Sequence, residues 1–65
     1  MSMLDLAKYI LDKISFDENL FIKELKKFIE WTKNEDLDEL KDWCFLKYGN
    51  VYGRIMINVF NSNLK

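Results

Sequence analysis

The chain has 65 residues, 49% of them hydrophobic, and its formal net charge is −1, so it fits one domain over residues 1–65 and lacks the basic character typical of nucleic-acid binding. No apolar run approaches the roughly 18 residues of a membrane-spanning helix. A single cysteine and no histidine exclude an internal disulfide and make a zinc site improbable on ligand chemistry.

The spacing of apolar residues predicts a first helix over residues 3–14. Charged side chains lie mostly on the opposite side, so we expect the apolar stripe to face a core. The stripe consists of Met3, Ala7, Ile10 and Ile14, with Leu6 and Leu11 beside it.

A second helix is predicted over residues 16–33. Ser15 and Glu18 have the spacing of a capping box, in which Ser15 accepts from the backbone N–H of Glu18 and the Glu18 side chain reaches back. Lysines and glutamates cover the outer face. The predicted inner face consists of Leu20, Phe21, Leu25, Phe28, Ile29 and Thr32.

A third helix is predicted over residues 37–48, with Asp36 as its N-cap and Glu39 three residues later. Its apolar side is formed by Leu37, Leu40, Cys44 and Tyr48, joined by Trp43, and Phe45 and Leu46 widen it beyond a normal stripe. Gly49 is expected to end this helix in the left-handed conformation that glycine adopts easily.

Residues 51–62 fit two interpretations. As a strand, their β-branched residues would alternate onto one face. As a helix, they follow a 3.6-residue period, and three preceding helices would leave a lone strand without a hydrogen-bonding neighbour. We therefore expect a helix here, and an all-α fold: a compact three- or four-helix bundle.

The sequence offers no recognisable catalytic, cofactor or metal site. Nucleophilic catalysis by serine or cysteine usually needs a neighbouring base, most often histidine. Cys44 lies among apolar residues, where its thiol is expected to be unreactive. The carboxylates fall on polar faces and at caps, and neither nucleotide-binding glycine motif is present. We predict that the chain is not an enzyme and binds no cofactor.

Two groups of residues suggest a binding surface instead. The segment Glu35–Asp42 has five acids and one lysine, a net charge of −4, which would attract a basic partner. Aromatic residues are common anchors of protein interfaces. The predicted partner-binding residues are Trp31, Trp43, Phe45 and Tyr52 as anchors, with Glu35, Asp36, Asp38, Glu39 and Asp42 as the acidic group.

These features favour a small protein-binding module that binds and modulates, most simply inhibits, another protein. Short length, excess aromatics and an acidic patch also occur in small inhibitors encoded by phages and mobile elements, which is an analogy of composition. A free cysteine without an export signal suggests the reducing cytoplasm. Nine lysines against one arginine, with many Ile, Asn and Phe, suggest an AT-rich genome of bacterial or phage type. The leftover apolar surface suggests a homodimer.

The alternative prediction is a helix-turn-helix regulator that binds DNA. Arg54, Asn58 and Asn61 would share one face of the tail helix, and arginine and asparagine contact base edges in the major groove. The acidic segment in the preceding helix opposes this interpretation, because it would lie near the phosphates.

Overall fold

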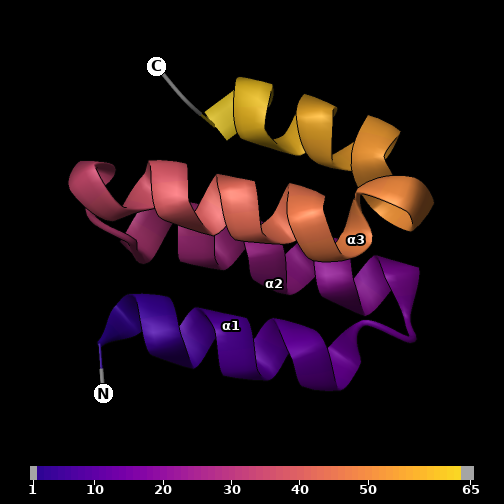
Figure 1. The fold of residues 1–65 in the computed structure, drawn as a ribbon, viewed down its shortest axis with the longest axis horizontal. Helices are drawn as coiled ribbons and strands as arrows, with labels where there is room; N and C mark the ends of the chain where they lie inside the picture. The colour runs from indigo at the N-terminus through magenta and orange to yellow at the C-terminus, as the bar shows by residue number, and fades with distance from the viewer. Residues whose placement is uncertain (1, 64–65) are drawn as a thin grey trace.

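The computed structural model describes residues 2–63, and within that range the chain forms three helices and no strand. They are α1 (Met3–Ile14), α2 (Glu18–Trp31) and α3 (Asn34–Asn63). Figure 1 shows α1 and α2 side by side, with the first half of α3 running along α2 and the second half turning back alongside the first. The all-α prediction is confirmed.

Helix α3 reverses direction near its middle. A straight helix of 30 residues would be about 45 Å long, yet the longest extent of the Cα atoms is 26 Å. The rings of Phe45 and Phe60 lie 6.1 Å apart, whereas 15 residues of straight helix would separate them by about 22 Å. We call residues 34–48 the N-terminal arm, residues 49–53 the bend and residues 54–63 the C-terminal arm (Figure 1).

The two arms correspond to the predicted helices 37–48 and 51–62, so the helical interpretation of the tail is confirmed. The predicted left-handed end at Gly49 is wrong, because no glycine among the described residues has a positive φ. Residues 34–63 instead form one helical element, α3, whose axis reverses at the bend.

The caps of the first two helices use short polar side chains. Ser2 caps α1 by accepting from the backbone N–H three residues later, at 3.1 Å. Asp17 caps α2 in the same way, through Leu20. The predicted capping box at Ser15 is wrong: the Ser15 hydroxyl donates to the carbonyl of Asp12, in the last turn of α1. A carboxylate at position 17 interacts more favourably than a hydroxyl with the positive end of the α2 dipole.

The start of α3 also differs from the prediction. Its first acceptor is the carbonyl of Lys33, which receives hydrogen bonds from the backbone N–H groups of Asp36 and Leu37 at 2.9 and 3.1 Å. Asp36 therefore lies inside the first turn rather than at the N-cap. Its charge still suits the helix dipole at this position.

The core lies between the three helices and includes both arms of α3. Fourteen apolar residues are buried, which is a large share of the described chain and explains how so short a sequence can form a core. They are Leu4, Ala7, Leu11, Phe21, Leu25, Phe28, Ile29, Leu37, Leu40, Cys44, Tyr52, Met56, Val59 and Phe60.

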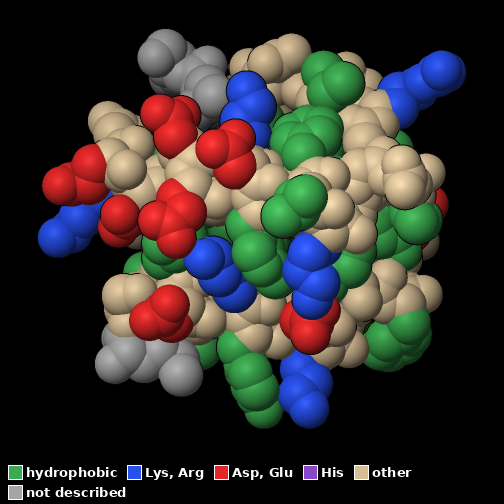
Figure 2. Space-filling model, viewed as in Figure 1, with side chains coloured by type: hydrophobic (Ala, Val, Ile, Leu, Met, Phe, Trp, Pro, Cys, Tyr) green, Lys and Arg blue, Asp and Glu red, His purple; other side chains and the backbone are tan. Residues whose placement is uncertain are grey.

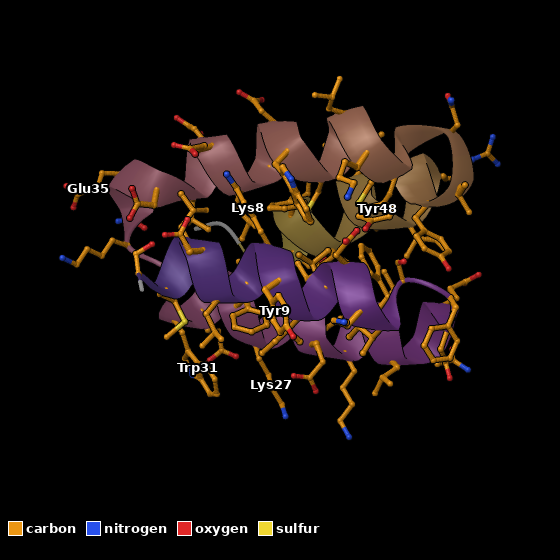
Figure 3. The ribbon with its side chains drawn as sticks, turned by 60° about the horizontal axis from the view of Figure 1, so that its bottom comes forward. Lys8, Tyr9, Lys27, Trp31, Glu35 and Tyr48 are labelled. Carbon is orange, nitrogen blue, oxygen red and sulfur yellow. The ribbon has the colours of Figure 1, made fainter. Side chains whose placement is uncertain are left out.

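Polar contacts hold α1 against the N-terminal arm of α3. The carboxylate of Asp12 accepts from Lys47 at 2.6 Å and from the hydroxyl of Tyr48 at 2.5 Å. These hydrogen bonds, that from Lys47 first, lower the pKa of Asp12 below its ordinary value. Further along α1, Lys8 pairs with Glu39 at 3.0 Å. Figure 3 shows Lys8 and Tyr48 in this seam between the helices.

Candidate partner-binding surface

Trp31 is the predicted anchor that the structure leaves most accessible. It is the last residue of α2, and 60% of its surface is exposed. The edge of its indole packs on the ring of Phe28, with the centroids 6.2 Å apart. In Figure 3 the indole points away from the bundle, on the same side as Tyr9 and Lys27. Trp31 is thus both exposed and oriented by a core residue.

Trp43 and Phe45 are half-buried, and each has an intramolecular role. The ammonium of Lys47 lies 5.3 Å from the centre of the Trp43 ring, and Tyr48 contacts the same ring edge-on at 5.7 Å. Phe45 packs against Phe60 of the C-terminal arm. The contacts of Trp43 are thus with neighbouring residues of the N-terminal arm, while the contact of Phe45 joins the two arms of α3.

Tyr52, the fourth predicted anchor, is buried. Its ring stacks on Phe21 with centroids 5.0 Å apart, and its hydroxyl donates to the carbonyl of Ser15 at 2.6 Å. The structure thus separates the four aromatic residues: Trp31 is on the surface, Trp43 and Phe45 lie at its edge, and Tyr52 lies in the core.

The acidic group lies on the outer side of the N-terminal arm of α3. Figure 2 shows acidic side chains gathered on the left of this face, over that arm. Four members are exposed and Asp36 is half-buried. Glu39 pairs with Lys8, while the other four form no ion pair with a residue in the range 2–63. Their charges are therefore available to a partner.

Trp31 and the acidic group lie at the same end of the bundle, which we call the α2–α3 end. Glu35 is four positions after Trp31, so their Cα atoms are at most about 14 Å apart. Figure 3 shows both side chains at this end, pointing away from the bundle along different edges. The structure brings the exposed indole close to the start of the acidic group. We call this group (Glu35, Asp36, Asp38, Glu39 and Asp42) the acidic row from here on.

A second group of exposed apolar residues, not predicted from the sequence, lies toward the opposite end. Phe16, Leu46 and Val51 are 83%, 87% and 72% exposed. The hydrogen bond from Tyr52 to Ser15 brings the α1–α2 turn, which includes Phe16, beside the bend of α3, which includes Val51. We call these three residues the bend patch. The sequence did contain one indication of exposed apolar residues near the bend, because the apolar surface of residues 44–48 is wider than a single buried stripe needs.

The three residues of the DNA-binding alternative are all exposed. Arg54, Asn58 and Asn61 are spaced to share one face of the C-terminal arm. Beside them is a shallow pocket of about 280 Å³, lined by Lys26, Asn58, Val59 and Ser62. In Figure 1 the C-terminal arm runs back along the N-terminal arm, whereas the helices of a helix-turn-helix cross at roughly 90–120°.

Cys44 is buried in the core, where desolvation raises the pKa of its thiol to about 12. A thiol with this pKa is almost entirely protonated at neutral pH and is a poor nucleophile or metal ligand. Across residues 2–63, no three or more cysteine, aspartate or glutamate side chains are grouped closely enough to hold a metal ion.

Within the same range, none of the helices has the length and apolar character needed to cross a membrane. The α2–α3 end and the bend patch contain the four most exposed large apolar side chains of the described residues, so they are the main candidates for a binding surface. Comparison with known proteins finds no matching family model, no matching curated protein and no matching solved structure.

Proposed function

We propose that this chain is a small non-enzymatic module that binds another protein through the α2–α3 end and inhibits it. The partner we propose has a basic surface with an apolar pocket, which would receive the indole of Trp31. The observation that carries the proposal is the exposed indole of Trp31 beside an acidic row with little internal neutralisation. A chain that covers a basic site on its partner would block whatever else binds there.

The position of Trp31 suits an anchor. Tryptophan is enriched among the few residues that dominate interface energies, because burying its large ring removes much apolar surface from water. The contact with Phe28 restricts the ring before binding. A restricted side chain loses less conformational entropy on association than a mobile one.

The acidic row suits the steering of a basic partner. Glu35 and Glu39 are four residues apart, as are Asp38 and Asp42, so each pair places like charges side by side on the helix. Such pairs destabilise a helix by a few tenths of a kcal/mol each. A basic partner would relieve this repulsion and would associate faster at low ionic strength.

The proposal also includes a homodimer, because the bend patch offers apolar surface for a second copy at the end opposite to Trp31. The cytoplasm and a phage or mobile-element origin remain expectations from composition.

The test is an affinity capture from the source cells with four tagged variants. Trp31→Ala and the double variant D38N/D42N should lose the partner, because one removes the anchor and the other removes two charges. The controls are Phe16→Ala, which removes an exposed ring at the far end, and D38E/D42E, which keeps both charges. A partner that is still captured by both Trp31→Ala and D38N/D42N would contradict the proposal. Equal loss of the partner from the two control variants would contradict it as well.

A DNA-binding function remains the second candidate, since Arg54, Asn58 and Asn61 are exposed beside Lys26. Binding to duplex DNA, measured by fluorescence anisotropy at low and moderate salt, separates the two proposals. DNA binding requires an affinity that falls steeply with salt and is lost in Arg54→Ala. The protein-binding proposal expects no binding even at low salt.

A further inference from the structure

We infer that the C-terminal arm of α3 exchanges between two copies of the chain, so that each arm packs in the core of the other. The exchange deepens the homodimer part of the proposed function by giving its mechanism. It uses the bend and the bend patch, and it leaves Trp31 and the acidic row free.

The first observation concerns the two glycines of the bend. Neither Gly49 nor Gly53 has a positive φ, and a Cβ added at either position would meet no atom within 4 Å beyond the adjacent residues and the backbone of the neighbouring helical turn. Neither the backbone conformation nor the available space therefore requires glycine here. Glycine is about 1 kcal/mol less favourable than alanine in a helix, so two glycines make this segment of α3 the easiest to rearrange.

The second observation is that the axis of α3 reverses at the bend without any residue of positive φ. Straightening the bend therefore requires no residue to leave the left-handed region. Once straight, α3 would be about 45 Å long, well beyond the 26 Å of the closed molecule. The C-terminal arm would then lie outside its own core.

The third observation identifies what the released arm would bind. Met56 and Phe60 are fully buried in the closed molecule, and the ring of Phe60 packs on Phe45 of the N-terminal arm. A straightened chain exposes these residues and also exposes the surface that they leave. A second straightened copy offers the same surface, so mutual exchange restores every core contact.

Residues of the bend patch would make additional contacts in the exchanged dimer. In a dimer with exchanged arms, the two straightened helices pass each other at residues 49–53. Leu46 lies just before this crossing and Val51 lies within it, and both are mostly exposed in the closed molecule. The second copy would cover them, which favours the dimer by the apolar surface removed from water.

The test is a cross-link between α2 and the C-terminal arm. Lys26 and Ser62 are exposed and line the same shallow pocket. We would make K26C/S62C and treat separated monomer and dimer fractions with a short bis-maleimide. In a closed monomer the link forms within one chain. In the exchanged dimer it joins two chains, which a denaturing gel resolves. The wild type is the control, because its only cysteine, Cys44, is buried.

The exchange predicts a dimer whose links join two chains, in proportion to the dimer present. A dimer with links only within chains contradicts the exchange but leaves the homodimer proposal standing. No dimer at high protein concentration, including after refolding, contradicts both.

A pair of substitutions tests the role of the bend. G49A/G53A should raise the dimerisation constant on the order of tenfold, since four glycines per dimer are replaced by a residue that favours a regular helix. Asn19→Ala, which raises helix propensity at an exposed position of α2, is the matched control and should leave the constant unchanged. A dimerisation constant that G49A/G53A leaves unchanged or lowers would overturn the exchange.

Discussion

Thr32 brings a polar group into the core without a partner. Its surface is 5% exposed, and its Oγ1 atom has no hydrogen-bond partner among the described residues. A buried polar atom without a partner costs roughly 1–3 kcal/mol. Because valine has nearly the same shape, Thr32→Val should raise the free energy of unfolding by about 1 kcal/mol. Urea denaturation measures the change. Thr32→Ser keeps the hydroxyl and loses a methyl group, so it should lower the free energy of unfolding. A Thr32→Val variant with a lower free energy of unfolding than the wild type would contradict this account.

The hydroxyl of Tyr52 ties the α1–α2 turn to α3. It donates to the carbonyl of Ser15 at 2.6 Å in a partly buried setting. Tyr52→Phe should lower the free energy of unfolding by about 1 kcal/mol, since the carbonyl loses its donor. Tyr9→Phe is the matched control, because Tyr9 is exposed on α1, and it should leave the stability unchanged in thermal denaturation. Equal effects of the two substitutions would mean that this hydrogen bond contributes nothing.

At the scale of the helix, the cap of α2 is the clearest test. Asp17 accepts from the backbone of Leu20, while the Ser15 hydroxyl donates within the end of α1. Asp17→Ala should cost about 1 kcal/mol, as the loss of an N-cap does. Ser15→Ala should cost much less, because its hydroxyl caps no N-terminus. A larger loss of stability for Ser15→Ala than for Asp17→Ala in chemical denaturation would contradict this assignment and favour the capping box at Ser15.

The helices were predictable from apolar spacing, but the exact buried face was not always so. For α2, five of the six predicted inner residues are buried, and Leu20 alone is exposed. For α1, the predicted stripe began at Met3, whereas the structure buries Leu4, Ala7 and Leu11. Helix α1 contacts both α2 and α3, so its buried face points between two neighbours. Spacing within one helix carries no information on where those neighbours lie.

Whether an aromatic residue is buried or exposed also depends on tertiary contacts. Tyr52 and Trp31 look equivalent in the sequence, as large rings on amphipathic helices. The turn at residue 52 directs Tyr52 toward Phe21, while Trp31 ends its helix and points outward. The acidic row was predictable, because five acids in eight residues cannot all turn inward. The reversal of α3 was visible only as a glycine-bearing gap between two helical patterns.

The Asp12 cluster joins two helices and makes the stability of the whole molecule depend on pH. Hydrogen bonds from Lys47 and Tyr48 lower the pKa of Asp12 in the folded state. A carboxyl whose pKa is lowered by folding stabilises the fold above its unfolded pKa, near 4, and loses this effect as the pH falls further.

The wild type should therefore exceed Asp12→Asn in free energy of unfolding at pH 7, and the difference should shrink as the pH falls below about 4. Urea titrations of both proteins across this range measure the difference. A gap between the two proteins that is constant with pH would show that the charge of Asp12 does not contribute.

The charges of the molecule are unevenly distributed. The segment Glu35–Asp42 has a net charge of −4 within a chain of net charge −1, so the rest of the sequence has a net charge of +3. The exposed apolar surface is divided as well, with Trp31 at the acidic end and the bend patch at the other. Under the proposals above, the partner protein and the second copy would use opposite ends of the molecule and would not compete.

The most direct test of partner binding through the α2–α3 end is the affinity of the purified partner for Trp31→Ala. An anchor that contributes about 2 kcal/mol predicts a dissociation constant raised about 30-fold. Phe16→Ala should bind as the wild type does, and circular dichroism should show both variants folded, since both rings are largely exposed. A folded Trp31→Ala variant with wild-type affinity would contradict the account.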